Sequence, residues 1–96
     1  MTMRVIRANL RLLPIGAGGR VSPIKSGYRS LVHFDDIDTD FGFELALDAE
    51  SLSPGESGNG RLTFWAVEEL PELVAGQSFE LREGKHVVGQ GTVLEP

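Results

Sequence analysis

Strict alternation of apolar and polar residues constrains this chain more than any other feature. From Ile6 to Leu12, apolar side chains take every second position and polar ones the positions between. From Phe41 to Leu47 the same period recurs. A period of two places successive side chains on opposite faces of a strand, whereas a helix needs a period near 3.6. The pattern therefore predicts an all-β protein whose strands bury one face.

Six strands follow from this pattern and its interruptions. They are expected at residues 6–12, 29–34, 41–47, 61–67, 77–82 and 86–94. Glycines and prolines crowd residues 14–28, which predicts a long loop, and turn-forming residues predict further connections at 35–40 and 53–60. The last two strands form a hairpin around residues 83–85, where Gly84 is expected to adopt positive φ. Six short strands at this spacing favour one small antiparallel barrel or sandwich spanning residues 1–96.

The inward positions of these strands define an expected core. It comprises Leu10, Leu12, Phe34, Phe43, Leu45, Phe64, Phe79, Leu81, Val88 and Val93. Trp65 falls on the face opposite Phe64. Either its strand is buried on both sides, or Trp65 is a partly exposed anchor of the kind enriched at interfaces.

Several classes of protein are excluded or disfavoured. With no cysteine, the chain has neither disulfides nor thiolate metal sites. No apolar run approaches the roughly 20 residues that span a membrane, and the first ten residues lack the apolar stretch of a secretory signal. We therefore expect a soluble, cytoplasmic protein with no membrane association.

No motif for catalysis or cofactor binding is present. Gly16 to Arg20 lacks the lysine and the following helix of a P-loop. Asp36, Asp38 and Asp40 alternate, but the glycine and glutamate that a calcium loop needs are replaced by Phe41 and Leu47. The histidines His33 and His86 have no metal-ligand spacing, and no serine lies in a nucleophile elbow. We expect a protein with no catalytic activity, cofactor or metal.

Charge is distributed unevenly along the chain. Residues 1–29 hold six basic and no acidic residues, whereas all fourteen acidic residues lie in 30–96, and the net charge is −5. Such asymmetry fits either pairing between neighbouring strands or separate charged faces that meet a partner. In the second case, two copies could associate weakly through these faces, so we expect a monomer or weak dimer.

Two segments resemble the third, C-terminal β-barrel domain of elongation factor Tu. Residues 18–29 read G-G-R-V-S-P-I-K-S-G-Y-R, where that domain has G-G-R-H-T-P and then G-Y-R-P-Q. Residues 79–94 read F-E-L-R-E-G-K-H-V-V-G-Q-G-T-V-L, close to its final F-x-I-R-E-G-G-R-T-V-G-x-G-x-V hairpin. The resemblance spans roughly residues 6–94. It implies a six-stranded Greek-key barrel, here without the nucleotide-binding domain of that factor.

The resemblance also points to positions that touch the T-stem of aminoacyl-tRNA in that family. Arg20, Glu83 and Gly84 match such positions. The departures are Val21, Leu31, Asp35, Asp40 and His86, with Lys85 one place before the last of these. Carboxylates near phosphate are repulsive, whereas RNA affinity depends on Lys and Arg.

We therefore expect a non-catalytic interaction module that binds a protein partner, which could be a translation component. The alternative is a weak tRNA- or RNA-binding module acting in translation. The expected contacts in either case are Arg20, Lys25, Arg29, Trp65, Glu83, Gly84 and Lys85. Several of the basic residues among them could equally be structural.

Overall fold

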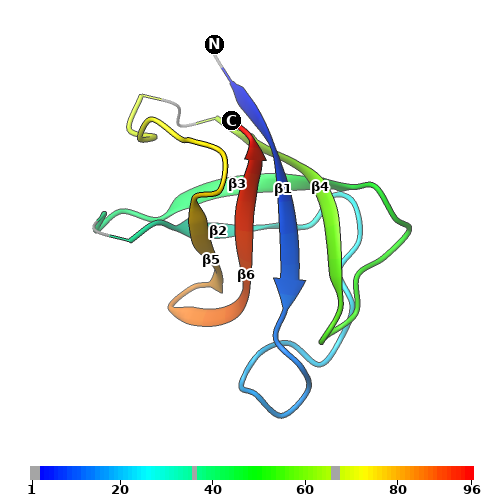
Figure 1. The fold of residues 1–96 in the computed structure, drawn as a ribbon. Helices are drawn as coiled ribbons and strands as arrows, with labels where there is room; N and C mark the ends of the chain where they lie inside the picture. Colours follow the sequence, from blue (N-terminus) through cyan, green and yellow to red (C-terminus); the bar gives the residue numbers. More distant parts are fainter. Residues whose placement is uncertain (1–2, 36, 66–67) are drawn as a thin grey trace.

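Six antiparallel strands close into a barrel in the computed structural model, which describes residues 3–35, 37–65 and 68–96 (Figure 1). The strands are β1 (Arg4–Leu12), β2 (Arg29–His33), β3 (Phe41–Leu47), β4 (Ser57–Phe64), β5 (Ser78–Glu83) and β6 (His86–Glu95). No helix occurs in these three described segments. The expected all-β fold class is confirmed.

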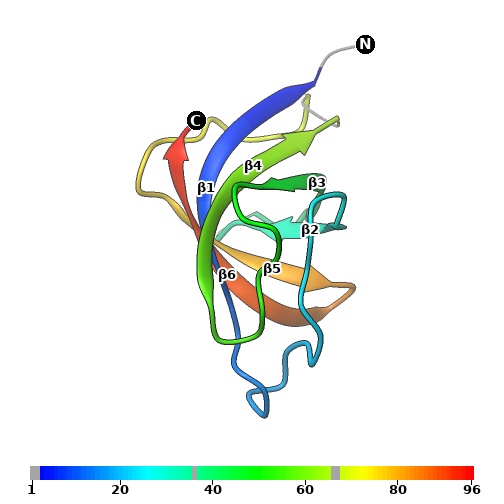
Figure 2. The same cartoon turned by 90° about the vertical axis from the view of Figure 1, so that its right-hand side faces the viewer.

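The strand order makes the barrel a Greek key. Around the barrel the strands run β1-β4-β3-β2-β5-β6, and β6 pairs with β1 to close it. Strands β2, β3 and β4 follow one another as neighbours, and β5 then returns to lie beside β2. This is the Greek-key arrangement. Figure 2 shows β1 and β4 curving over one side of the barrel.

Side chains fill the barrel interior, as expected for so few strands. Every residue of the predicted core is buried: Leu10, Leu12, Phe34, Phe43, Leu45, Phe64, Phe79, Leu81, Val88 and Val93. Phe34 packs edge-on against Phe79 at 5.9 Å between ring centroids. No polar or charged residue is buried among those described. The alternation in the sequence therefore identified the inward face correctly.

The fourth strand differs from its prediction. It begins at Ser57 rather than residue 61, so the expected loop over 53–60 was wrong for its last four residues. Gly58 and Gly60 lie inside the strand where space is tight. A Cβ at Gly60 would sit 2.8 Å from the Ala46 carbonyl oxygen, and one at Gly58 would sit 3.1 Å from Leu52 Cδ1. The strand ends at Phe64, and residues 66 and 67 of the predicted strand lie outside the described residues. The strand predicted at 41–47 matches β3 at both ends, and the ends of the other strands agree with the prediction to within two residues.

The long loop between β1 and β2 is attached to the barrel. It projects beyond one end of the barrel before rising to β2 (Figure 2). Ile24 forms a two-way backbone bridge with Leu52, and both side chains are buried. The Gly27 N–H also donates to the Leu45 carbonyl at 2.8 Å. The loop is therefore held in a defined path despite its glycines and prolines.

Candidate interaction surface

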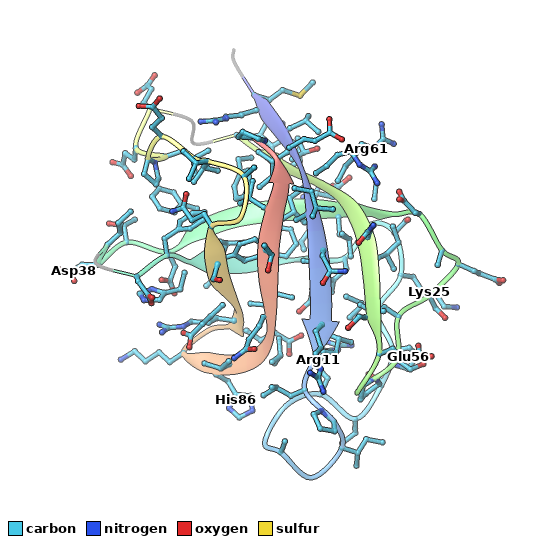
Figure 3. All side chains as sticks on the ribbon, viewed as in Figure 1. Arg11, Lys25, Asp38, Glu56, Arg61 and His86 are labelled. Atoms are coloured by element: carbon cyan, nitrogen blue, oxygen red, sulfur yellow. The ribbon has the colours of Figure 1, made fainter. Side chains whose placement is uncertain are left out.

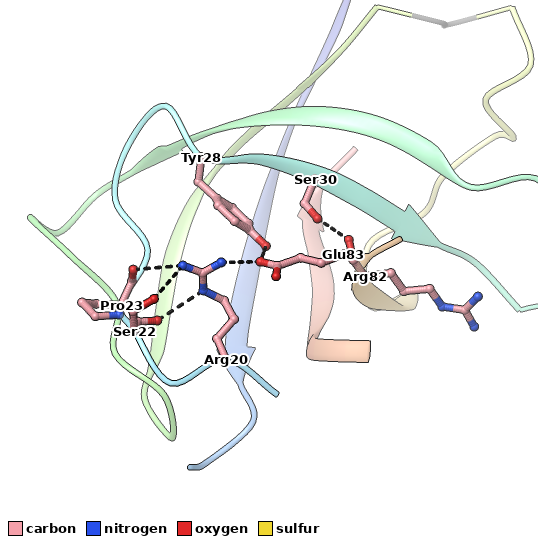
Figure 4. Close-up of polar contacts among 7 residues, drawn as sticks. All are labelled: Arg20, Ser22, Pro23, Tyr28, Ser30, Arg82 and Glu83. Atoms are coloured by element: carbon pink, nitrogen blue, oxygen red, sulfur yellow. Dashed lines mark hydrogen bonds and ion pairs between the residues drawn. The ribbon is translucent and has the colours of Figure 1, made fainter. Parts of the chain in front are cut away.

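The loop between β1 and β2 is tied to the β5–β6 hairpin by three side chains (Figure 4). The Arg20 guanidinium pairs with Glu83 Oε2, and the Tyr28 hydroxyl donates to the same oxygen at 2.6 Å. The guanidinium carbon of Arg20 also lies 5.2 Å from the centre of the Tyr28 ring. We refer to Arg20, Tyr28 and Glu83 as the latch, because they join segments far apart in the sequence.

Arg20 has further acceptors within its own loop. Its Nε donates to the Ser22 carbonyl at 3.2 Å, and Nη2 donates to Ser22 Oγ at 3.0 Å and to the Pro23 carbonyl at 3.5 Å. All three nitrogens of the guanidinium are thus engaged inside the chain. Arg20 therefore holds its own loop together and joins it to the β5–β6 hairpin.

The latch shifts the proton affinities of two of its members. Burial raises the pKa of Tyr28 to about 12, and the hydrogen bond to the Glu83 carboxylate acts in the same direction. For Glu83, burial acts to raise the pKa, but hydrogen bonds from Tyr28 and Arg20 outweigh it and hold the pKa below its usual value. At neutral pH the latch therefore combines a neutral phenol, a carboxylate and a guanidinium.

The hairpin turn beside the latch has the geometry predicted for it. Gly84 has φ of 63°, a backbone region that L side chains rarely adopt. The turn therefore requires glycine for backbone reasons. Lys85, the next residue, is exposed at the tip of this hairpin.

Arg29 and Trp65, two of the predicted contacts, meet on a different part of the surface. The Arg29 guanidinium carbon lies 5.7 Å from the centre of the Trp65 ring, and Nη2 pairs with Glu44 at 2.6 Å. The two residues flank a surface hollow of about 320 Å³. Its other lining residues are Ser30, Gly42 and Phe43. We refer to this feature as the Trp65 hollow.

Trp65 is 43% exposed, whereas Phe64 beside it is 1% exposed. Trp65 is therefore partly exposed rather than buried on both sides of its strand, and its role as an interface anchor stays a prediction. Gly42 and Trp65 line the same hollow, and Gly42 contributes no side chain that would fill it. An ideal Cβ at Gly42 would meet only the Ser30 carbonyl oxygen, at 4.0 Å.

The acidic turn and the basic loop lie apart. Figure 3 shows Asp38 and Lys25 on opposite sides of the barrel. In the acidic turn, Asp40 Oδ1 lies 2.8 Å from His33 Nδ1, and Asp40 Oδ2 lies 3.7 Å from Arg82 Nη1. Asp36 lies outside the described residues. In the described parts of the chain, no three His, Asp or Glu side chains are grouped as metal ligands would be.

Three of the six basic residues in the first third of the chain pair with acidic residues from the remainder. Arg7 pairs with Asp48 at 2.6 Å, while Arg20 and Arg29 pair with Glu83 and Glu44. Each pair joins the basic first third to the acidic remainder. The interpretation as internal pairing is confirmed for these three arginines. Lys25, by contrast, points outward from its loop (Figure 3).

Among the expected contacts, then, Arg20 and Glu83 form the latch, Gly84 shapes its turn, and Lys25 and Lys85 are exposed. Only Arg29 and Trp65 converge on a hollow. Sequence reasoning did not single out Tyr28, although it is the only tyrosine and lies in the G-Y-R motif.

No protein-family model matches this chain. Within residues 3–35, 37–65 and 68–96, no helix has the length and apolar character required to cross a membrane.

Proposed function

We propose that this barrel is a non-catalytic interaction module that binds a protein partner through the Trp65 hollow. The observation that carries the proposal is the meeting of Arg29 and Trp65 around that hollow. Tryptophan and arginine are the side chains most enriched among residues that dominate binding energy at interfaces. An apolar side chain of the partner would insert against the Trp65 ring, above Gly42.

The local charge favours a protein over a nucleic acid at this hollow. Glu44 neutralises Arg29 at 2.6 Å, so the hollow does not present a free cation to phosphate. An exposed tryptophan beside a floor without side chains suits a projecting apolar group. Burial of apolar area at about 25 cal/mol per Å² then supplies most of the favourable free energy.

An RNA-binding role receives less support. Such binding depends on Lys and Arg that are free to approach phosphates. Arg20 is committed to Glu83 and to its own loop, so it is not free to approach a phosphate. Lys25 lies across the barrel from Asp38, so the acidic turn would not repel a phosphate bound near Lys25. The weak RNA-binding function therefore remains the alternative proposal.

The resemblance to the third domain of elongation factor Tu guides the choice of partner. It makes translation components, including the GTPase domain of an elongation factor, the first proteins to test. The motifs behind the resemblance lie in the latch and its hairpin and include Arg29, but they do not include Trp65 or Gly42. The proposal for the Trp65 hollow therefore rests on its own geometry.

The test begins with affinity capture from the source cell, with both protein and RNA identified, and continues with purified components. Trp65 is the only tryptophan, so its fluorescence reports directly on the hollow. Gly42→Val fills the hollow without touching Trp65, because a Cβ fits at Gly42. Val21→Ala, which alters a 78% exposed apolar side chain in the β1–β2 loop, is the matched control.

We expect the captured protein to change Trp65 fluorescence on titration. Trp65→Ala should weaken binding by roughly 2 kcal/mol or more, about thirtyfold in Kd, which is the size of an interface hot spot. Gly42→Val should weaken it similarly, and Val21→Ala should leave it unchanged. Capture of RNA at physiological salt, with affinity lost on Lys25→Ala and Lys85→Ala, would replace this proposal with the alternative.

A further inference from the structure

A second hollow lies on the outer face of four neighbouring strands, β4, β1, β6 and β5. The strand register arranges its outward side chains in two rows. One row is Asn59, Asn9, Thr92 and Ser78. The other is Ser57, Arg11, Gln90 and Glu80. This face is polar throughout, in contrast to the Trp65 hollow.

The face is hollowed where these rows meet. A hollow of about 470 Å³ is lined from β1 by Asn9 and Arg11 and from β6 by Gln90 and Thr92. A smaller hollow of about 180 Å³ adjoins it and shares Gln90. The two also share Ser78 and Phe79, so they form one groove, which we call the polar groove.

Hydrogen-bonding groups in the polar groove are mostly uncommitted. Asn9 Nδ2 donates to Asn59 Oδ1 at 2.9 Å. Within the part of the chain that the structure describes, no hydrogen bond is made by the side chains of Arg11, Ser57, Ser78, Gln90 and Thr92. Elsewhere on the surface Arg7 and Arg29 hold carboxylates, and at the acidic end of the groove Arg82 pairs with Glu80 at 2.7 Å. The groove thus offers amides and hydroxyls that can both donate and accept.

The two ends of the polar groove carry opposite charge. Arg11 lies at one end, whereas Asp35 and Glu80 line the other. Glu80 is already paired with Arg82, so the acid at that end for which the described residues supply no ion pair is Asp35. Arg11 on β1 and Glu80 on β5 both face Gln90 on β6, so they are two strand spacings apart, about 10 Å. A ligand that fits this arrangement has an anionic and a cationic group at a similar separation.

We propose that the polar groove binds an extended peptide segment with an acidic residue over Arg11 and a basic residue toward Asp35 and Glu80. An extended chain rises about 3.3 Å per residue, so the two charges would be about three residues apart. Backbone amides between them match the donors and acceptors of Asn9, Gln90 and Thr92.

Other ligand classes fit the polar groove less well. Sugar rings and nucleobases are usually held by an exposed aromatic face. The one aromatic residue in this groove, Phe79, is only 4% exposed. Strand addition is excluded because β6 pairs with β1 and the closed barrel has no free edge. Recognition here must come from side chains.

The test uses the full chain and a displayed library of random linear peptides. An enriched peptide is then synthesised and its binding measured by calorimetry. The variants are Arg11→Glu and Gln90→Ala, both at exposed positions that leave the core untouched. Trp65→Ala is the control, because it alters the other hollow and separates this proposal from the proposed function. A glycan array is screened in parallel.

We expect enriched peptides to carry an acid and a base about three positions apart. Binding should fall at least about tenfold in Arg11→Glu, about 1.4 kcal/mol, and be restored when the peptide's acid is replaced by lysine. Gln90→Ala should weaken binding and Trp65→Ala should not. The proposal is overturned by a library that yields no enriched peptide, by peptides indifferent to both groove variants, or by glycans that bind at Gln90 in their place.

Discussion

The hydroxyl of Tyr28 donates a hydrogen bond to Glu83 Oε2 at 2.6 Å, across 55 positions of sequence. Arg20 pairs with the same oxygen. One carboxylate thus joins the long β1–β2 loop to the β5–β6 hairpin, the two segments whose motifs led us to expect a domain similar to that of the elongation factor. The latch explains why R-E-G-K and G-Y-R occur in one chain: each supplies part of one contact.

The latch should be visible in the alkaline titration of the protein. The chain has a single tyrosine, so tyrosinate absorbance reports Tyr28 alone. We expect a midpoint at a pKa of about 12, above the ordinary 10. Because the folded pKa is the higher one, the stability gained from Tyr28 is complete below pH 10 and is lost as the pH rises toward 12.

Glu83→Gln is the matched variant for this titration. It should lower the pKa of Tyr28 without returning it to the ordinary value, because burial is the larger cause of the shift. Circular dichroism at the same pH must show that the barrel is still folded. A midpoint at the ordinary value in a folded protein would contradict the buried, hydrogen-bonded position of Tyr28.

The free energy of unfolding should change between neutral and acid pH in a way that depends on Glu83. Its folded pKa is depressed, so its contribution is present above the ordinary value of 4.5 and is lost as the pH falls through the folded value. Urea melts from neutral to acid pH should therefore show wild type more stable than Glu83→Gln near neutrality. The difference should shrink below pH 4.5. Glu50→Gln, at an exposed position, should show no comparable loss.

Gly84 should resist replacement for backbone reasons alone. Its φ of 63° is sparsely populated by other residues, and no atom within 4 Å would clash with a Cβ. Gly84→Val should destabilise the barrel by roughly 1–3 kcal/mol in denaturant melts. Gly84→Asn should cost less, because asparagine tolerates the left-handed region better than valine. Equal stability of wild type and Gly84→Val would remove the conformational explanation.

Period-two alternation was sufficient to predict the fold class and the core. It placed Leu10, Phe34 and Val88 inside because successive side chains of a strand point to opposite faces of the sheet, so every second residue points into the barrel. It gave the wrong start for β4, since Gly58 and Gly60 usually indicate a loop. Only the pairing with β1 and β3 shows that these glycines permit close packing.

Sites were harder to predict than strands because their members meet only in space. Arg29 and Trp65 were each expected as contacts, but their convergence depends on the pairing of β2, β3 and β4. The polar groove was not foreseen. Its only signal was the set of outward positions in β1 and β6, and their alignment requires the strand register.

Gly60 should be intolerant of even one added methyl group. A Cβ there would lie 2.8 Å from the Ala46 carbonyl oxygen and 3.1 Å from Leu45 Cδ1, and backbone cannot easily yield. Gly60→Ala should therefore destabilise by about 1–3 kcal/mol, the range for overpacking a core. Gly42→Ala is the control, since its nearest contact would be 4.0 Å away, and we expect it to be neutral or slightly stabilising. The same denaturant melts compare both variants, and equal effects would contradict the close approach of β3 and β4.

Self-association should be weak because the barrel pairs much of its own charge. Arg7, Arg20 and Arg29 already hold acidic partners from later in the chain. Exposed ion pairs between copies contribute only about 0–1 kcal/mol each, so those left over would guide association more than stabilise it. We expect sedimentation to show a monomer of 10.4 kDa, or a weak dimer that dissociates as salt rises through about 0.5 M.

A tight dimer whose stability does not change with salt would contradict this prediction and would require an apolar interface. Trp65→Ala would then decide whether that interface is the Trp65 hollow, in which case the partner bound there is a second copy of this chain.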